Sequence, residues 1–242
     1  MIDAPGVAPH DVPPIGRYTP APASDRLRRK VPFITAWSGE VRAQPRLVWR
    51  GDRIGFANER PRDRDAFGVL WRRAANKPGQ GKPLFGKTHA GRQRRAMGGL
   101  LCQVCGTPTR PEATNDGVLF LLSRTDYEWQ PWPAPIKITH PPVCIRCVPV
   151  SVSACPHLRD DYVGIRCRAP RLYGVNGVMH MPRSGTVPIP DATHPIGTMP
   201  FADTRIGLIH AAQLVVKLDH YTLVDFASEL SAPARRTGHS RR

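Results

Sequence analysis

The sequence lacks any long apolar run and any secretion-type segment near its N-terminus. No stretch approaches the ~18 apolar residues that a membrane-spanning helix requires. Residues 1–25 have neither a basic start nor an apolar core of signal-peptide length. These absences predict a cytoplasmic protein without a membrane segment. In that reducing compartment, paired cysteines are more often metal ligands or redox centres than structural disulfides.

Acidic side chains are too few to balance the basic ones in the first hundred residues. Residues 1–100 contain 20 basic and 8 acidic residues, whereas residues 101–232 contain 11 of each. Arginine outnumbers lysine by 29 to 6, as a GC-rich coding sequence would produce, but that bias would spread arginine evenly. The net charge of +16 and its segregation therefore predict a basic surface in the first hundred residues, with nucleic acid as the expected partner.

Large apolar side chains are nearly absent from residues 1–30, which are rich in proline and alanine. Such a composition buries too little apolar surface to offset the entropy of folding, so we predict a disordered arm. The arm ends in a basic cluster that we expect to add salt-dependent contacts to phosphate groups: Arg26, Arg28 and Arg29.

Residues 31–89 form a basic N-terminal segment whose patterns indicate folded structure. Apolar residues on both sides of Gly51-Asp52 predict a hairpin over 46–56. In residues 64–74, the spacing i, i+3, i+4 predicts one apolar face of a helix, formed by Phe67, Leu70 and Trp71. The glycine and proline content of 76–87 predicts a loop.

The rest of the chain combines a short helix with several strands. A basic helix over 91–97 leads through a double glycine into the first cysteine pair, and the apolar run 116–123 predicts a strand. Alternation in 161–169 predicts another strand, and the Asn-Gly in 172–180 predicts a hairpin turn. The long apolar segment 205–228 fits either two strands or a helix and a strand.

These patterns predict an α+β, β-rich fold without internal repeats, in which a small zinc-binding module precedes a β-rich C-terminal domain. The expected parts are the disordered arm (1–30), the basic segment (31–89), the zinc module (90–160), the C-terminal domain (161–232) and a basic tail (233–242).

Two Cys-x-x-Cys pairs, "CQVC" at 102–105 and "CIRC" at 144–147, contain four of the six cysteines. Such a turn presents two thiolates on one side, and two turns complete the tetrahedral shell of a structural Zn²⁺ ion. Gly106 permits the tight first turn, and Pro141-Pro142 leads rigidly into the second. A redox role would require a βαβ context, which the sequence lacks. We therefore predict zinc bound by Cys102, Cys105, Cys144 and Cys147.

The two remaining cysteines leave two interpretations open. Cys155 and His157 are two residues apart, Cys167 follows ten residues later, and His180 would complete a second metal site. The alternative is a pair of half-buried cysteines with ordinary histidines, because these spacings match no common zinc finger.

"GRQRRAMGGLLCQVCG", an apolar strand and then "THPPVCIRC" resemble the treble-clef zinc fold over residues 90–158. In particular, they resemble the zinc-bearing frame of HNH endonucleases, including proteins of actinobacterial or phage type. The resemblance implies a basic helix before the first zinc turn and a second helix beginning at the second pair. Alternating valines in 148–152 fit a strand equally well, which keeps a zinc ribbon open. On the basic helix, the expected phosphate contacts are Arg92, Arg94 and Arg95.

The sequence departs from the HNH pattern at the catalytic position. HNH enzymes place an Asp-His or His-His pair at the end of the first strand after the zinc turn, but here no histidine lies between Cys105 and His140. We therefore predict nucleic-acid binding without catalysis. One alternative is an HNH-type metal-dependent endonuclease with a displaced site at His140 and Asp126. The other is a phage or mobile-element assembly or adaptor protein, in which zinc is structural and the C-terminal domain binds a protein partner.

Overall fold

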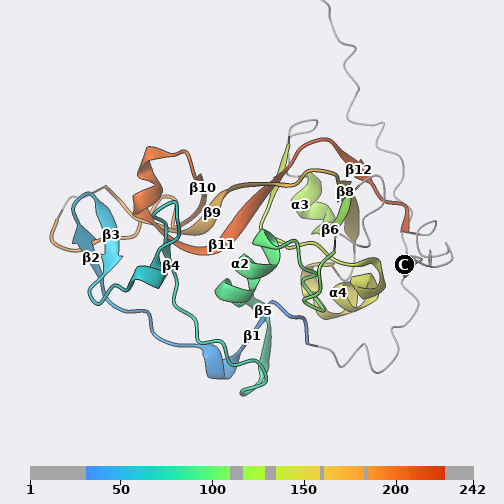
Figure 1. Ribbon diagram of the computed structural model, residues 1–242, viewed down its shortest axis with the longest axis horizontal. Coiled ribbons are helices and arrows are strands. Elements are labelled where there is room, and N and C mark those ends of the chain that lie inside the picture. Colours follow the sequence, from blue (N-terminus) through green and yellow to red (C-terminus); the bar gives the residue numbers. More distant parts are fainter. Residues whose placement is uncertain (1–30, 110–116, 129–134, 159–160, 183–184, 227–242) are drawn as a thin grey trace, which may run out of the picture.

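Figure 1 shows a β-rich protein with a few short helices, and the predicted α+β, β-rich class is confirmed. No helix in the described part of the chain is long and apolar enough to cross a membrane. The computed structural model describes five stretches of the chain: 31–109, 117–128, 135–158, 161–182 and 185–226. The predicted disordered arm and basic tail lie outside these stretches, and so do the phosphate contacts predicted for Arg26, Arg28 and Arg29.

Within these five stretches, three short α-helices and several 3-10 helices connect the strands. The α-helices are α2 (Ala90–Gly98), α3 (Arg124–Glu128) and α4 (Val148–Ala154). The 3-10 helices are η1 (Ser38–Glu40), η2 (Pro61–Asp63), η4 (Ile145–Cys147), η5 (Pro156–Leu158) and η6 (Thr204–Leu208).

The largest sheet has five strands with β11 at its centre. β11 pairs antiparallel with β9 on one side. Along its other side it runs parallel to β4 near its start and antiparallel to β7 near its end. β10 extends the sheet beyond β9. The strands are β4 (Leu70–Trp71), β7 (Ile136–Ile138), β9 (Arg171–Met179), β10 (Ile196–Pro200) and β11 (Ile209–Leu218).

The Asn-Gly hairpin predicted in 172–180 is wrong. Asn176 and Gly177 lie inside β9, which pairs with β10 on one side and β11 on the other. A Cβ on Gly177 would lie 2.7 Å from Ala211 Cα, so this glycine allows two backbones to approach closely. Pairing on both sides keeps the segment extended and outweighs its local preference for a turn.

A second, three-stranded antiparallel sheet places β8 (Tyr162–Cys167) between β6 (Val118–Ser123) and β12 (Tyr221–Leu223). β6 is the apolar strand predicted at 116–123, and all six of its residues are buried. Because β6 pairs with β8, the residues before and after position 160 share one sheet.

β6 separates two apolar cores, because successive side chains of a strand point to opposite faces. Val118, Phe120 and Leu122 belong to the larger core, which the strands of the five-stranded sheet also line. Leu119 and Leu121 belong to a smaller core around the cysteine pairs. The cysteine region is therefore packed directly against the main body of the protein.

Residues 31–89 supply two two-stranded ribbons, which lie at the left and the bottom of Figure 1. The predicted hairpin over 46–56 is confirmed, since Arg50 pairs with Arg53 across a two-residue turn in which Gly51 has a φ of +70°. The loop predicted over 76–87 is wrong from Pro83 onward, where the chain pairs with a distant strand. The ribbons are β2 (Leu47–Arg50) with β3 (Arg53–Phe56), and β1 (Thr35–Trp37) with β5 (Pro83–Thr88).

The amphipathic helix predicted over 64–74 is wrong. Gly68 has a φ of +76°, which a right-handed helix excludes. Asp65 instead forms a turn, accepting hydrogen bonds from the backbone N–H groups of Phe67 (3.0 Å) and Val69 (3.1 Å). The chain then enters β4, with Trp71 buried and Phe67 exposed.

The predicted basic helix over 91–97 is confirmed as α2, which packs against β11. The buried side-chain amide of Gln93 forms two hydrogen bonds with the backbone of Leu214 in β11. It donates to the Leu214 carbonyl and accepts from the Leu214 N–H, both at 2.9 Å. Gly99 ends the helix with a bond from its N–H to Arg95 O (3.0 Å). These bonds fix α2 where the chain enters the first cysteine turn.

Candidate metal centre and cationic surface

The first cysteine pair forms a tight turn shortly after α2. The turn is closed by hydrogen bonds from Cys102 N–H to Thr107 O and from Gly106 N–H to Cys102 O, both 2.8 Å long. Gly106 has a φ of +73°, a left-handed conformation that favours glycine. Val104 N–H donates to Cys102 Sγ (3.4 Å), which stabilises the thiolate form of this side chain.

Backbone hydrogen bonds bring the second pair to the first. Gln103 N–H, within the first turn, donates to Pro142 O (2.8 Å), and Val143 N–H donates to Leu119 O (2.9 Å) in β6. The second pair then forms η4, and α4 follows with Pro149 in its first turn, a position that proline favours. The strand considered for 148–152 is therefore wrong, and a helix begins at the second pair.

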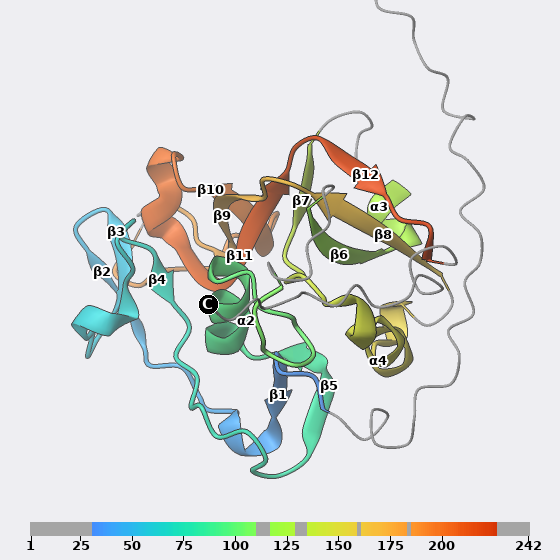
Figure 2. The ribbon, with the colours of Figure 1, turned by 45° about the vertical axis from the view of Figure 1, so that its right-hand side comes forward.

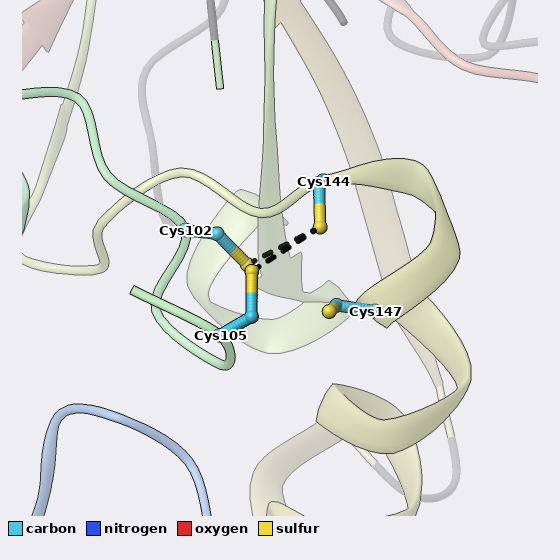
Figure 3. A group of neighbouring side chains, drawn as sticks. All are labelled: Cys102, Cys105, Cys144 and Cys147. Carbon is cyan, nitrogen blue, oxygen red and sulfur yellow. Dashed lines mark hydrogen bonds between the residues drawn. The ribbon is translucent and has the colours of Figure 1, made fainter. Parts of the chain in front are cut away.

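The four sulfur atoms converge on one point between the two turns (Figure 3). All four lie within 4.8 Å of one another. Cys144 Sγ is 3.5 Å from Cys102 Sγ and 3.7 Å from Cys105 Sγ. A tetrahedral ion with metal–sulfur bonds of ~2.3 Å would place its ligands about 3.8 Å apart. The cysteines are free thiols, so the cluster has the size and the donor atoms to hold one metal ion.

The electrostatics of the cluster favour a bound cation. Hydrogen bonds from the Cys144 and Cys147 thiols hold the pKa of Cys102 far below its usual value, although burial opposes this shift. Interaction with Cys102 raises the pKa of Cys144 to about 12, and it also raises the pKa of Cys147. The first thiolate therefore suppresses ionisation of its neighbours. A divalent cation would allow all four thiols to deprotonate.

Within the described residues, this is the one group of three or more His, Cys, Asp or Glu side chains that could hold a metal ion. The residues considered for a second site are not brought together. Cys155 packs against the core around the first site, whereas Cys167 lies in β8 and donates to Asp219 O (3.3 Å). His180 is buried at the end of β9, and His157 is exposed. Their positions fit the interpretation as ordinary cysteines and histidines.

His140 and Asp126, the candidates for a displaced nuclease site, are both exposed. Asp126 exchanges hydrogen bonds with Ser123 at the end of β6: its carboxylate accepts from the hydroxyl (2.7 Å), and its N–H donates to the same oxygen (3.0 Å). His140 lies between β7 and the second cysteine pair. No hydrogen bond or ion pair joins the two side chains in the described part of the chain.

Arg92, on α2, has a buried side chain that contacts Glu40. Its two Nη atoms donate to the two carboxylate oxygens at 2.6 and 2.8 Å, and Nη2 also donates to Thr35 O (2.6 Å). Burial alone would raise the pKa of Glu40, but the bonds from Arg92 and two backbone N–H groups lower it to about 2. The prediction that Arg92 contacts phosphate is wrong, because its guanidinium is buried and donates its hydrogen bonds to Glu40 and Thr35.

Arg94 and Arg95 lie at the surface, each against an aromatic ring. The Arg94 guanidinium is 4.5 Å from the centre of the Trp71 ring, and that of Arg95 is 4.9 Å from the centre of the Phe33 ring. Such stacking orients a guanidinium while leaving its edge open to hydrogen-bond acceptors. Arg95 is exposed and Arg94 is half-buried, so their predicted phosphate contacts remain predictions.

The exposed charge of residues 31–109 is almost entirely positive. Of five acidic residues there, only Asp52 is exposed, and the others are turned inward. Glu40 pairs with Arg92, Glu59 with Arg64 and Asp63 with Arg73, while Asp65 caps the turn before β4. Eleven cationic side chains of this segment are exposed, and we term this set the cationic surface: Arg42, Arg46, Arg50, Arg53, Arg60, Arg62, Arg72, Lys77, Lys82, Lys87 and Arg95.

Sequence reasoning located this surface only as an excess of charge in the first hundred residues. The residues it predicts on α2 include the buried Arg92 and leave out Lys82 and Lys87, which lie just before and within β5. The motif "GKPLFGK", with an aromatic residue between two lysines, was the available signal.

Comparison of the chain with protein-family models, with curated proteins and with solved structures gives no match, so its function is inferred from its own residues.

Proposed function

We propose that this protein binds nucleic acid through the cationic surface, and that a zinc ion held by the four cysteines stabilises the fold. The proposal rests above all on the ratio of eleven exposed cations to one exposed acid in residues 31–109. The proposed activity is binding, and it assigns no catalytic role to His140 or Asp126.

The pairing of the acidic residues strengthens this argument. A chain with this composition could neutralise many arginines by ion pairs at its surface, but Glu40 and Asp63 are buried with partners that are themselves largely enclosed. Apart from Arg50, which lies 3.5 Å from Glu59, no ion pair with an acidic residue of the described chain is seen for the exposed arginines and lysines of residues 31–109. A surface of this kind attracts a polyanion and releases the counterions condensed on it.

Zinc is the metal that best fits the donor set. Four thiolates in a small cluster suit Zn²⁺ far better than hard cations such as Mg²⁺ or Ca²⁺, which prefer oxygen ligands. The order of a cysteine turn, the strand β6 and the helix α4 starting at the second pair supports a treble-clef-like arrangement. The ion would hold the turn after α2 against the start of α4.

Salt dependence provides the first test. The affinity for a labelled 20-base-pair duplex would be measured by fluorescence anisotropy between 50 and 300 mM NaCl. We expect the logarithm of the association constant to fall linearly with the logarithm of the salt concentration, by about 0.9 for each phosphate contact. An affinity that does not respond to salt would overturn the proposal.

A pair of variants locates the surface. Arg60→Ala with Arg62→Ala removes two exposed charges from the cationic surface, and we expect the salt slope to fall by about two. The matched control, Arg171→Ala with Arg205→Ala, removes two exposed arginines that sit beside aspartates in the C-terminal part. If the control weakens binding as much as the test pair, the contacts do not lie on the cationic surface.

A further inference from the structure

The β1–β5 ribbon contains a bulge, in which three residues of β5 are not paired with β1. Ala36 pairs with Leu84, and the next residue back, Thr35, pairs with Thr88. The residues between these partners in β5, Phe85-Gly86-Lys87, therefore have no partner in β1. Such bulges commonly re-aim side chains at functional positions.

These three residues are all exposed. Phe85 is 49% exposed, and beyond its chain neighbours no atom lies within 4 Å of the position that a Cβ on Gly86 would occupy. Lys82 and Lys87, both exposed, flank the phenyl ring in the sequence. The ribbon thus presents an exposed aromatic residue that two exposed lysines flank in the sequence.

Three other aromatic residues of the segment 31–109 are buried or stacked within the protein. Phe56 and Trp71 are buried, and the exposed ring of Phe67 is stacked on Phe201, with centroids 4.0 Å apart. Within the described residues, Phe85 takes part in no ring stacking or cation–π contact. The exposed part of its ring is therefore not engaged by another aromatic ring or by a cation of the described chain.

The ribbon is held in place by Glu40, at the end of η1. Its carboxylate accepts from Trp37 N–H in β1 (2.9 Å) and from Lys77 N–H (2.8 Å), in addition to Arg92. Ser38 further ties the two strands, because its hydroxyl accepts from Lys82 N–H (2.9 Å). A platform fixed in this way loses little conformational entropy when a ligand binds.

We infer that Phe85 is a base-stacking platform and that the nucleic acid bound by this protein is single-stranded. An unpaired base exposes its face to an aromatic ring, and the lysines on each side would contact the adjoining phosphates. A duplex offers only its edges and its backbone, so an exposed ring gains nothing from it. This inference rests on the proposed function and names the class of nucleic acid.

The test compares three labelled probes at 100 mM NaCl: oligothymidylate, oligouridylate and a DNA hairpin duplex of equal charge. Phe85→Ala is expected to weaken binding of a single-stranded probe about tenfold while changing duplex binding less than twofold. Phe85→Trp should retain the affinity, because it keeps a stacking surface. Lys82→Ala with Lys87→Ala should weaken binding of all three probes, since every probe carries phosphates.

Phe67→Ala is the matched control, because it also removes an exposed phenyl ring but one that already stacks within the protein. A loss with either DNA or RNA single strands supports the inference and identifies the sugar. Losses no greater for Phe85→Ala than for Phe67→Ala would overturn it, while leaving nucleic-acid binding intact. Wild-type protein that binds none of the probes would overturn the proposed function itself.

Discussion

Arg92 and Glu40 form a two-pronged ion pair inside the protein, with Nη1–Oε1 and Nη2–Oε2 distances of 2.6 and 2.8 Å. The pair joins α2 to the turn after β1, although the two residues are 52 positions apart. Glu40 at the same time accepts from the backbone N–H of Trp37 in β1 and of Lys77, in the segment that leads to β5. One carboxylate therefore positions both the helix before the cysteine turn and the ribbon that carries Phe85.

Replacing Arg92 with leucine is expected to destabilise the protein by about 3–5 kcal/mol, because it leaves the Glu40 carboxylate buried without its partner. Urea unfolding at pH 7 measures the difference. Arg205→Leu is the control: its guanidinium pairs with Asp203 at the surface, so a change within about 0.5 kcal/mol is expected. Similar losses in both variants would show that the buried pair has no special role.

Stability should fall with acid between pH 6.5 and 4 because of His210. Burial, followed by the charges of Arg72 and His180, lowers the pKa of His210 from 6.5 to about 4. In this window His210 is protonated in the unfolded chain but stays neutral in the folded protein. The free energy of unfolding therefore falls by about 3 kcal/mol as the pH is lowered from 6.5 to 4. This contribution is fully present above pH 6.5.

Urea midpoints at pH 7, 5.5 and 4.5 would measure this effect in the wild type and in His210→Leu. The variant should show a shallower loss, and the remainder comes from the other groups whose pKa the fold lowers, among them His180, whose pKa burial lowers. Glu40 contributes little in this range, because its pKa of 4.5 in the unfolded chain and about 2 in the folded protein place most of its loss below pH 4.5. Parallel curves for the two proteins would exclude His210 as the cause.

Loss of the metal is expected to unfold the region around both cysteine turns. Cys102→Ser and Cys144→Ser should each abolish metal binding and lower the melting temperature sharply, because three ligands hold Zn²⁺ less tightly than four. Metal content of the purified protein, measured by plasma mass spectrometry, should be one zinc per chain. Cys155→Ser, which alters a half-buried cysteine outside the cluster, should keep the metal. Metal retained by Cys102→Ser would contradict the assignment.

Gly177→Ala should destabilise the central sheet by about 1–3 kcal/mol or more, because the new methyl group meets backbone that cannot move aside. It would lie 2.7 Å from Ala211 Cα and 2.9 Å from His210 C. Gly86→Ala places the same group in open space and should cost little. Thermal unfolding of the two variants provides the comparison, and equal midpoints would show that β9 and β11 can separate at Gly177.

The sequence alone determined those elements of this protein whose structure depends on residues close together in the chain. The hairpin at 46–56 follows from a two-residue turn, and α2 from a short helical run ended by two glycines. The four cysteines could be paired from their spacing alone, since each Cys-x-x-Cys turn forms locally. The choice between strand and helix after Cys147 could not be made in this way, because alternating valines serve both.

Only the tertiary structure decided which residues face inward. The sequence pattern around Gly177 predicts a turn, but this residue lies in a strand that is paired on both sides. Similarly, the pattern predicts that Arg92 binds phosphate, but its side chain bonds a carboxylate 52 positions away. Phe85 reads as part of a loop but sits on a bulge opposite β1. In each case the partner comes from a distant part of the chain, and its energy of pairing exceeds the local preference that the sequence displays.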